Sequence, residues 1–334
     1  MQTNRKAQVL QKRSQLFQQL RAFFYARSVI EVDTPMLSIG AVPDCHLKSL
    51  QTQVQVPGLR DPQTFYLHTS PEYPMKRLLC EGSGDIFYLG KVFRDGDLSP
   101  RHQVEFTMLE WYRLGFSMFD LMDEVVTLIQ AVMSVTHKQP LKVEQLSYQQ
   151  AFSKYAGIDD IFTASAERCR LCLDQNGVPE IVGVDLDDKV LWEQLILTEV
   201  IEAQLGLDAT DKNQPAITAL YHFPANQASL AQVPADNPLV AERFEVFVNG
   251  MELANGYHEL ADANVYRERF EASLAERKAL GFDLVPLDEN LLKTLAEKSL
   301  SDCSGVALGV DRLFLLQQGL ADISDGIGFG LLES

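Results

Sequence analysis

The sequence of 334 residues contains no stretch that approaches the roughly 18 consecutive apolar residues of a membrane-spanning helix. Segment 1–20 mixes charged residues and glutamines with its apolar positions, so it lacks the continuous apolar core of a secretory signal. Cysteine is also scarce, and its odd count of 5 does not indicate a disulfide framework. These absences predict a cytoplasmic protein that is not attached to a membrane.

Basic residues are fewer than acidic residues. The chain has 29 Lys and Arg against 46 Asp and Glu, which gives a net charge of −17. A surface with this excess of acids repels polyanions unless positive charge is gathered locally, so extensive binding of nucleic acid is disfavoured. Apolar residues make up 46% and charged residues 22%, close to the values of globular proteins, which excludes a disordered or fibrous chain.

The remaining pattern predicts helices grouped around clustered strands. Apolar residues at three- and four-residue steps predict helices at 5–27, 118–135, 261–280 and 288–299. Aromatic, β-prone runs predict strands at 65–69, 87–93, 106–112 and 305–309, and Asn249-Gly250 predicts a tight hairpin between 244–248 and 251–254. This order favours an α+β fold with an antiparallel sheet in a single domain, 1–334, with a partly helical insertion at about 137–215.

Four familiar motifs are incomplete. Segment 84–91 has one residue too many for a phosphate-binding P-loop, and Val92 stands where Ser or Thr should hold magnesium. His258-Glu259 lacks the second histidine of a zinc protease, because Asp262 occupies that position. The pair Cys169 and Cys172 and the three C-terminal glycines stand alone, so they predict neither a metal site nor a nucleotide fingerprint.

A polar loop, 94–105, joins two of the predicted strands. Side chains alternate along a strand, so Phe106, Glu110 and Tyr112 share one face, which has an aromatic end and a carboxylate end. The loop carries basic residues that could meet phosphates through charge-assisted hydrogen bonds, namely Arg94, Arg101 and His102. A structural hairpin with a solvated charged loop is the alternative interpretation.

The second cluster lies on the hairpin around Asn249-Gly250. A two-residue turn places Phe247 opposite Glu252, and Ala254 opposite Glu245. Glu245 and Glu252 then lie diagonally on one face, about 7 Å apart at Cα, where they could share a magnesium ion through oxygen ligands. Two acids in an otherwise apolar hairpin are costly unless paired, although a solvated face remains the alternative.

The third cluster is Arg312 after a strand of small residues at 305–309. Small residues let a flat ligand approach the backbone, and Arg312 could cover such a ligand by cation–π stacking. A structural salt bridge is the alternative interpretation for this arginine.

Together these segments resemble the three signature motifs of class II aminoacyl-tRNA synthetases. Segment 24–35, which ends at Pro35, looks like motif 1, 93–106 looks like motif 2, and 305–312 (GVALGVDR) looks like motif 3. Segments 69–78 and 252–259 look specifically lysyl. The resemblance covers about 5–320 and implies the class II catalytic fold, ATP and Mg²⁺ as cofactors, and a homodimer formed through motif 1.

Lysyl-tRNA synthetases carry an N-terminal OB-fold domain for the anticodon, whereas here the motif 1 helix begins within the first dozen residues. We therefore expect no anticodon-binding domain. A stand-alone lysyl-type core with FTMLEWYR, YHFPANQASLAQ and SDCSGVALGVDR is similar to the bacterial elongation factor P lysine ligases. That family activates lysine, preferentially (R)-β-lysine, and transfers it to a lysine side chain of elongation factor P, so the resemblance implies this protein as acceptor and no tRNA.

The resemblance also implies roles for individual residues. Arg94, Glu252 and Arg312 are the expected catalytic residues, and Glu245 and Glu252 the expected magnesium ligands. The expected ATP-binding residues are Arg94, Asp95, Gly96, Arg101, His102, Gln103, Phe106, Glu245, Val246, Gly305 and Arg312, with adenine between Phe106 and Arg312. The expected amino-acid-binding residues are Ser70, Pro71 and Glu72 for the backbone-type amine, and Glu110, Tyr112, Asn255 and Glu259 for the distal ammonium.

Motif 2 departs from the usual pattern at two places. Gly96 stands where a glutamate usually contacts adenine, so this contact passes to the backbone or to Asp97. Gln103-Val104 replaces the commoner Asn-Pro. Neither change removes a phosphate-binding or metal-binding group.

Other functions stay open on the sequence alone. A lysine-activating enzyme with a tRNA or small-molecule acceptor is one alternative, and a non-catalytic synthetase-like regulatory protein is another. The net charge of −17 argues against tRNA, and the presence of the catalytic residues argues against a silent protein. Lysine and β-lysine differ by the position of one amine, a change worth only about 1–3 kcal/mol, so the sequence does not choose between them.

Ser70-Pro71-Glu72 is typical of a helix start, with Ser70 as N-cap and Pro71 at the first helical position. Since Arg94 and Arg101 are assigned to ATP, the nearest basic candidates for docking an acidic acceptor are Lys76 and Arg77 on that helix. A solvated helix face is the alternative interpretation.

Overall fold

The computed structural model describes residues 2–333, and the side chains of residues 6–333. Positions 1 and 334 of the predicted domain therefore lie outside the described residues. The chain forms two compact units, which we call the first unit (Met1–Ser117 with His258–Ser334) and the second unit (Met118–Tyr257). None of the described helices combines the length and the apolar content that a membrane crossing requires.

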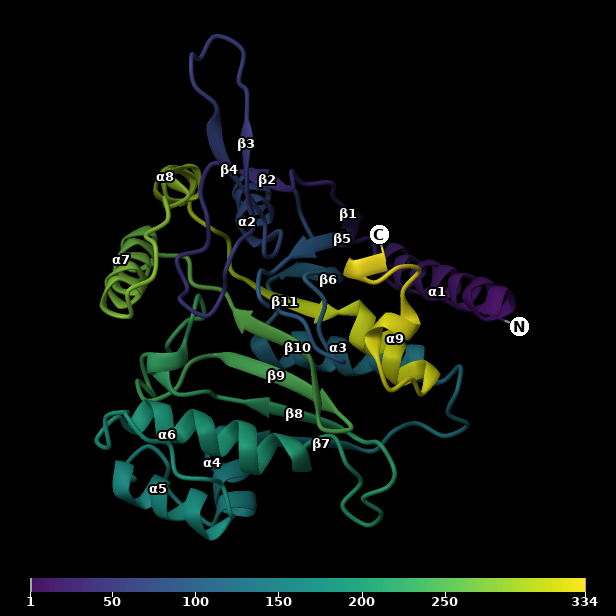
Figure 1. Ribbon diagram of the computed structural model, residues 1–334, viewed down its shortest axis with the longest axis vertical. Coiled ribbons are helices and arrows are strands. Elements are labelled where there is room, and N and C mark those ends of the chain that lie inside the picture. Colours follow the sequence, from purple (N-terminus) through teal and green to yellow (C-terminus); the bar gives the residue numbers. More distant parts are fainter. Residues whose placement is uncertain (1, 334) are drawn as a thin grey trace. The chain divides into compact units, whose positions relative to one another are not determined.

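The first unit contains four neighbouring strands in the order β1-β5-β6-β11. β5 pairs antiparallel with β6, β6 pairs antiparallel with β11, and the short β1 runs parallel to β5. Figure 1 shows helix α9 following directly from β11. The bounds of these strands are Ile30–Glu31 for β1, Ile86–Phe93 for β5, Glu105–Leu114 for β6 and Cys303–Gly309 for β11.

Helices and a small sheet complete the first unit. Its helices are α1 (Gln2–Tyr25), α2 (Glu72–Cys80), α7 (Ala263–Ala279), α8 (Glu289–Lys298) and α9 (Val310–Gln318). The small sheet has the order β2-β4-β3, with β2 at Leu37–Ser38, β3 at Gln51–Val54 and β4 at Gln63–Leu67. Helix α8 packs against α2 and α7, and the β3–β4 hairpin projects away from these helices (Figure 1).

The second unit has four strands in the order β10-β9-β8-β7, antiparallel except for the parallel pair β7–β8. The strands are β7 (Val143–Ser147), β8 (Ile217–Tyr221), β9 (Arg243–Val248) and β10 (Met251–His258). The helices are α3 (Met118–Met133), α4 (Tyr148–Ala151), α5 (Ala166–Gln175) and α6 (Lys189–Ile196). The proposed insertion at 137–215 lies inside this unit, where α4–α6 gather (Figure 1) and pack a core of their own with Leu220 and Phe247.

These elements confirm the predicted mixture of antiparallel strands and surrounding helices. The predicted helices and strands are present with their ends shifted by a few residues. One helix start differs, because α2 begins at Glu72 and Pro71 occupies the capping position. Ser70 still contributes, since its Oγ accepts a hydrogen bond of 3.4 Å from the Glu72 backbone.

The hairpin register corrects one prediction. The turn at Asn249-Gly250 has positive φ angles of 53° and 66°, as a tight hairpin turn requires, and Glu252 lies opposite Phe247 as predicted. A β-bulge between Glu252 and Ala254 then shifts the pairing, so Asn255 rather than Ala254 lies opposite Glu245. A bulge adds one unpaired residue to a strand, and the alternating sequence pattern gives no sign of it.

A buried arginine fixes α1 to the middle of the first unit. Arg13 is 9% exposed, pairs with Asp311 at the start of α9, and donates a 2.9 Å hydrogen bond to Thr107 Oγ1 on β6. The Thr107 backbone donates to the other Asp311 oxygen at 2.8 Å. Thr107 and Asp311 each adjoin a predicted ATP-binding residue, Phe106 and Arg312, so this network holds both in place.

We expect Arg13→Met to lower the free energy of unfolding by about 3–5 kcal/mol, because it leaves the buried Asp311 carboxylate without its cation. Urea unfolding followed by circular dichroism measures this loss. Arg21→Met is the matched control on the same helix, since Arg21 pairs with Glu31 at a more exposed position, 3.0 Å away. The control loses less than about 1 kcal/mol, and equal losses in the two variants would show that the Arg13 network does not anchor α1.

Candidate active site

Three carboxylates of the first unit gather in one place. Glu110 on β6 is 2% exposed, Glu259 shortly before α7 is 3% exposed, and Glu72 is the first residue of α2. The charges of Glu72 and Glu259 both act on the pKa of Glu110, so the three lie within close electrostatic range. We call these three residues the carboxylate cluster, and all of them were predicted to bind the amines of a diamino acid.

Glu110 presents one oxygen to a ligand. Its Oε1 accepts a hydrogen bond of 2.9 Å from the hydroxyl of Tyr112, two residues along the same face of β6. Its Oε2 is buried and accepts no hydrogen bond from the described residues. A buried carboxylate oxygen without a donor is unfavourable, so an N–H group of a ligand would be stabilised there.

Burial raises the pKa of two acids of the carboxylate cluster, Glu110 and Glu259. It raises the pKa of Glu110 well above its usual range, and the charge of Glu72 adds to this effect. Burial also raises the pKa of Glu259 to about 7, against the opposing effect of Lys76. Because a bound ammonium group favours the ionised form of a carboxyl, a cationic ligand would drive protons off these two acids.

Lys76 lies inside the carboxylate cluster, which corrects its prediction as a docking residue. Its side chain is fully buried, and its Nζ lies 2.6 Å from oxygens of both Glu72 and Glu259. Residues four apart share one face of a helix, so Lys76 turns inward together with Glu72. The following residue, Arg77, is exposed as predicted.

Strand β11 supplies small residues beside the cluster. Gly305 lies opposite Tyr112, and Ala307 lies opposite Glu110. A Cβ atom on Gly305 would overlap both the Tyr112 ring and the Glu259 carboxylate, so only glycine fits at this position. Gly305 was predicted beside adenine, and the structure places it against the carboxylate cluster.

The polar loop after β5 gathers the predicted phosphate-binding residues. The Arg94 backbone donates to the Val104 carbonyl at 2.9 Å, which closes the base of the loop. The Arg94 guanidinium lies over the Phe106 ring, 5.2 Å from its centre. Gly96 has a φ of 89°, which glycine adopts without a steric penalty, and Asp95 pairs with Lys48 at 2.5 Å.

Arg312 reaches this loop from α9. It donates to His102 Nε2 and, at 3.4 Å, to the Arg101 carbonyl. His102 Nδ1 lies 2.8 Å from Ser99 Oγ, and because Nε2 accepts from Arg312, the neutral imidazole carries its proton on Nδ1. The structure thus brings Arg101, His102 and Arg312 together, with the buried Gln103 next to them. The position of adenine between Phe106 and Arg312 stays a prediction.

The second unit holds the two acids predicted to bind magnesium. Glu245 Oε1 accepts hydrogen bonds from Arg243 at 2.6 Å and from Asn255 Nδ2 at 3.0 Å. Burial raises the pKa of Glu245 to about 8, Arg243 lowers it, and the charge of Glu252 raises it further. Asn255 and the buried Val246 therefore lie beside these acids, within the second unit, and the carboxylate cluster belongs to the first unit.

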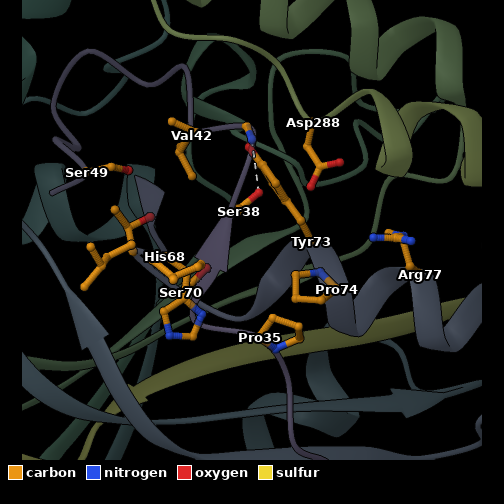
Figure 2. Close-up of a pocket in the computed structure, with 15 residues that line it drawn as sticks. Pro35, Ser38, Val42, Ser49, His68, Ser70, Tyr73, Pro74, Arg77 and Asp288 are labelled. Atoms are coloured by element: carbon orange, nitrogen blue, oxygen red, sulfur yellow. Dashed lines mark hydrogen bonds between the residues drawn. The ribbon is translucent and has the colours of Figure 1, made fainter. Parts of the chain in front are cut away.

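A small cavity of about 120 Å³ lies along another face of α2 (Figure 2). Tyr73, Pro74 and Arg77 line it from the helix, and Ser70 is the one residue among the predicted site residues in its lining. Glu72 and the rest of the carboxylate cluster do not line it. The cavity is therefore a feature separate from that cluster.

Three functional candidates were absent from the predicted site. Lys76 could have been placed from its four-residue spacing to Glu72, and Arg243 from its alternation with Glu245 on one strand face. Tyr266, whose hydroxyl accepts a 2.9 Å hydrogen bond from Lys76, has no local signal, because it lies 190 residues away along the chain.

Comparisons with known proteins agree with this arrangement. The family model described as class II tRNA synthetases (D, K and N) matches residues 1–333. A protein of Salmonella paratyphi B named elongation factor P–(R)-beta-lysine ligase is 44% identical over 320 residues, which cover 96% of this chain and 94% of that protein. A protein of Photorhabdus laumondii with the same name is 42% identical over 325 residues, 97% of this chain and 95% of its own length.

These matches confirm the predicted resemblance, the class II α+β fold and the predicted class of enzyme, an ATP-dependent ligase. They cover nearly the whole of both chains, so they extend over every element that carries the carboxylate cluster and the polar loop. This chain therefore belongs to the class II tRNA synthetases of the D, K and N type.

Proposed function

We propose that this enzyme activates (R)-β-lysine or lysine with ATP and transfers it to a lysine side chain of translation elongation factor P. The observation that carries the proposal is the carboxylate cluster, with the buried Glu110 Oε2 open to a donor. The names of the relatives in Salmonella paratyphi B and Photorhabdus laumondii support the choice of substrate and acceptor. We place the reaction in the cytoplasm, where translation factors act.

Recognition of the amino acid follows from charge. The distal ammonium would donate to Glu110 Oε2 and Glu259, beside the Tyr112 hydroxyl. The backbone-type amine would lie near Glu72, next to Ser70 and Pro71. Carboxylates in a buried place bind cations far better than neutral groups, so the cluster selects amino acids with two amines.

Activation joins the substrate carboxylate to ATP. The carboxylate oxygen attacks the α-phosphorus, the bond to the β-phosphate oxygen breaks, and pyrophosphate leaves with the electron pair. Arg94 would stabilise the charge that develops on the α-phosphate, because a fixed guanidinium acts most strongly where charge grows in the transition state. Arg101, His102 and Arg312 would hold the outer phosphates and the adenine.

Magnesium fits the two acids of the second unit. Glu245 and Glu252 offer hard oxygen donors. The charge of Glu252 raises the pKa of Glu245, and a divalent cation would favour the ionised form of Glu245. These two residues would hold the ion, which when bound neutralises charge on the triphosphate. Arg243 keeps Glu245 in place through its hydrogen bond of 2.6 Å to Oε1.

Transfer completes the reaction. The uncharged ε-amine of the acceptor lysine attacks the carbonyl carbon of the adenylate, the bond to the phosphate oxygen breaks, and AMP leaves as the amide forms. We expect a protein acceptor rather than tRNA, because the net charge of −17 repels nucleic acid. The exposed Arg77 remains a candidate for contact with an acidic acceptor. Lys76 is no longer a candidate, because its side chain is buried.

Intact-mass measurement tests this function. Elongation factor P is incubated with the enzyme, ATP, magnesium and either lysine isomer, and we expect its mass to rise by one lysyl residue. A parallel reaction with tRNA should yield no aminoacyl product. Pyrophosphate exchange without a mass change would favour a different acceptor, and no exchange with either isomer would favour a non-catalytic protein.

We also expect a homodimer. The segment that resembles motif 1 and the residues on either side of it expose large apolar side chains that a partner would cover, namely Leu10, Tyr25, Ile30, Met36, Leu37 and Ile39. Light scattering at micromolar concentration should give about twice the mass of one chain. An active monomer at that concentration would contradict this prediction.

A further inference from the structure

Lys76 is a lysine with no access to solvent and with all its hydrogen-bonding capacity used. Its ammonium lies 2.6 Å from Glu72 Oε1, 2.6 Å from Glu259 Oε2 and 2.9 Å from the Tyr266 hydroxyl. An ammonium has three N–H donors, and three oxygen atoms surround it here, two in hydrogen bonds and Glu259 Oε2 in an ion pair. Lys76 therefore has no hydrogen left for substrate or for a docking partner.

The burial of this charge is costly, so its position needs a reason beyond stability. Apolar residues often replace buried ion pairs without loss of stability, which makes such a pair poor evidence of a purely structural role. Here the ammonium joins two acids that are assigned to opposite ends of the substrate. It fixes Glu72 on α2 to Glu259, which belongs to a distant part of the sequence.

The charges of the site can be counted. With all its carboxyls ionised, the carboxylate cluster carries three negative charges, and the Lys76 ammonium cancels one of them. The two that remain equal the number of ammonium groups in a diamino acid. The third acid, Glu110, makes no ion pair with Lys76 in the structure, and its Oε2 is the oxygen that accepts no hydrogen bond from the described residues.

We propose that Lys76 is a positioning residue that sets the charge of the amino-acid site at two negative charges and holds Glu72 and Glu259 in register for a diamino acid. This inference rests on the proposed function. Lys76 does not touch the substrate in this scheme, and it acts through the two carboxylates. The two negative charges of the site thereby balance a ligand with two ammonium groups and do not balance a ligand with one.

Chemical rescue tests the proposal in the full-length enzyme. Lys76→Ala removes three methylenes and the ammonium, which together correspond to n-propylammonium. In lysine-dependent pyrophosphate exchange we expect the KM for lysine to rise at least tenfold, with a smaller change in kcat, and millimolar n-propylammonium to restore the KM. The uncharged 1-propanol fills the same space and should restore nothing.

The pH profile separates charge setting from a packing role. Without Lys76 an uncompensated carboxyl retains its proton, so the KM for lysine in Lys76→Ala should fall more steeply with rising pH than in the wild type. Lys293→Ala, which truncates an exposed lysine on the neighbouring helix α8, is the control and should keep the wild-type KM and profile. An unchanged KM, or rescue by 1-propanol as well as by the amine, would overturn the proposal.

A milder variant covers the possibility that Lys76→Ala does not fold. Tyr266→Phe removes one acceptor from the Lys76 ammonium and leaves the ion pairs in place, so the KM for lysine should rise a few-fold with kcat nearly unchanged. A wild-type KM in this variant, with Lys76→Ala unfolded, would count against the proposal. Absence of lysine-dependent exchange in the wild-type enzyme would instead refute the proposed function, which keeps the two failures distinct.

Discussion

Glu252→Gln should reduce pyrophosphate exchange by about 100-fold or more, because it removes one of the two negative charges that would bind magnesium. The amide has nearly the shape of the carboxylate, and Glu252 is half-buried on β10, so the fold should remain intact. Glu252 is the better position for this test than Glu245. The Glu245 carboxylate balances the charge of Arg243 at 2.6 Å, so its loss would also disturb packing.

A second measurement checks the metal assignment independently of activity. In the wild type, ATP should raise the melting temperature more when magnesium is present, and Glu252→Gln should lose most of that additional rise. Glu199→Gln, an exposed acid of the same unit, is the control and should behave like the wild type. Full exchange activity in Glu252→Gln with an unchanged response to magnesium would remove Glu252 from the metal site.

Local patterns were sufficient for the parts of the site that lie on one strand pair. Alternation along β6 correctly placed Glu110 and Tyr112 on one face, and the pairing of β6 with β11 then set Ala307 and Gly305 opposite them. The hairpin turn was equally predictable, because Asn249-Gly250 adopts the positive φ angles that few other residue pairs tolerate.

Local sequence patterns could not predict the contacts between distant segments. Lys76 was predicted as a docking residue, with a solvated helix face as the alternative, because its partners Glu259 and Tyr266 come from a segment far along the chain and give no local signal. Arg13 and Asp311 are 298 positions apart and meet only after β6 and α9 have packed. The hydrophobic pattern of a helix indicates which face is buried. It does not indicate which charged residue on that face forms an ion pair with a distant segment.

The bulge on β10 illustrates a different limit. Its extra residue moves Asn255 opposite Glu245, where the amide donates to the carboxylate at 3.0 Å. The same residue types in an unbulged hairpin would have placed Ala254 there and left that oxygen with one fewer donor. Bulges arise from local twist and neighbouring strands, so their effect on a site is visible only in the folded chain.

Lysine binding should be coupled to the release of protons, and the effect should centre on Glu110. Burial first, and then the charge of Glu72, raises the pKa of Glu110 well above its usual range, so in the free enzyme this carboxyl keeps its proton to a higher pH than an ordinary glutamate does. An ammonium group at Oε2 stabilises the ionised form and lowers that pKa. The complex therefore binds fewer protons than the free enzyme, and the affinity for lysine rises with pH.

The expected slope is up to about a tenfold gain in affinity per pH unit for each proton released, over the range below the raised pKa values of the free enzyme. Glu259, whose pKa burial raises to about 7, adds its own contribution on the acid side of neutrality. Isothermal titration calorimetry in buffers of different ionisation enthalpy counts the protons directly. We expect a net release of protons by the wild type near pH 6.

Glu110→Gln measures how much the Glu110 carboxyl contributes to proton release and to the affinity for lysine. The amide cannot ionise, so the variant should release fewer protons than the wild type, and its affinity for lysine should fall by about 10- to 100-fold, because a buried ammonium loses its charged acceptor. Glu105→Gln, at the exposed start of the same strand, is the matched control and should leave both quantities unchanged. If Glu110→Gln released as many protons as the wild type, the titrating group would lie elsewhere, and the affinity loss would then reflect only a weaker hydrogen bond.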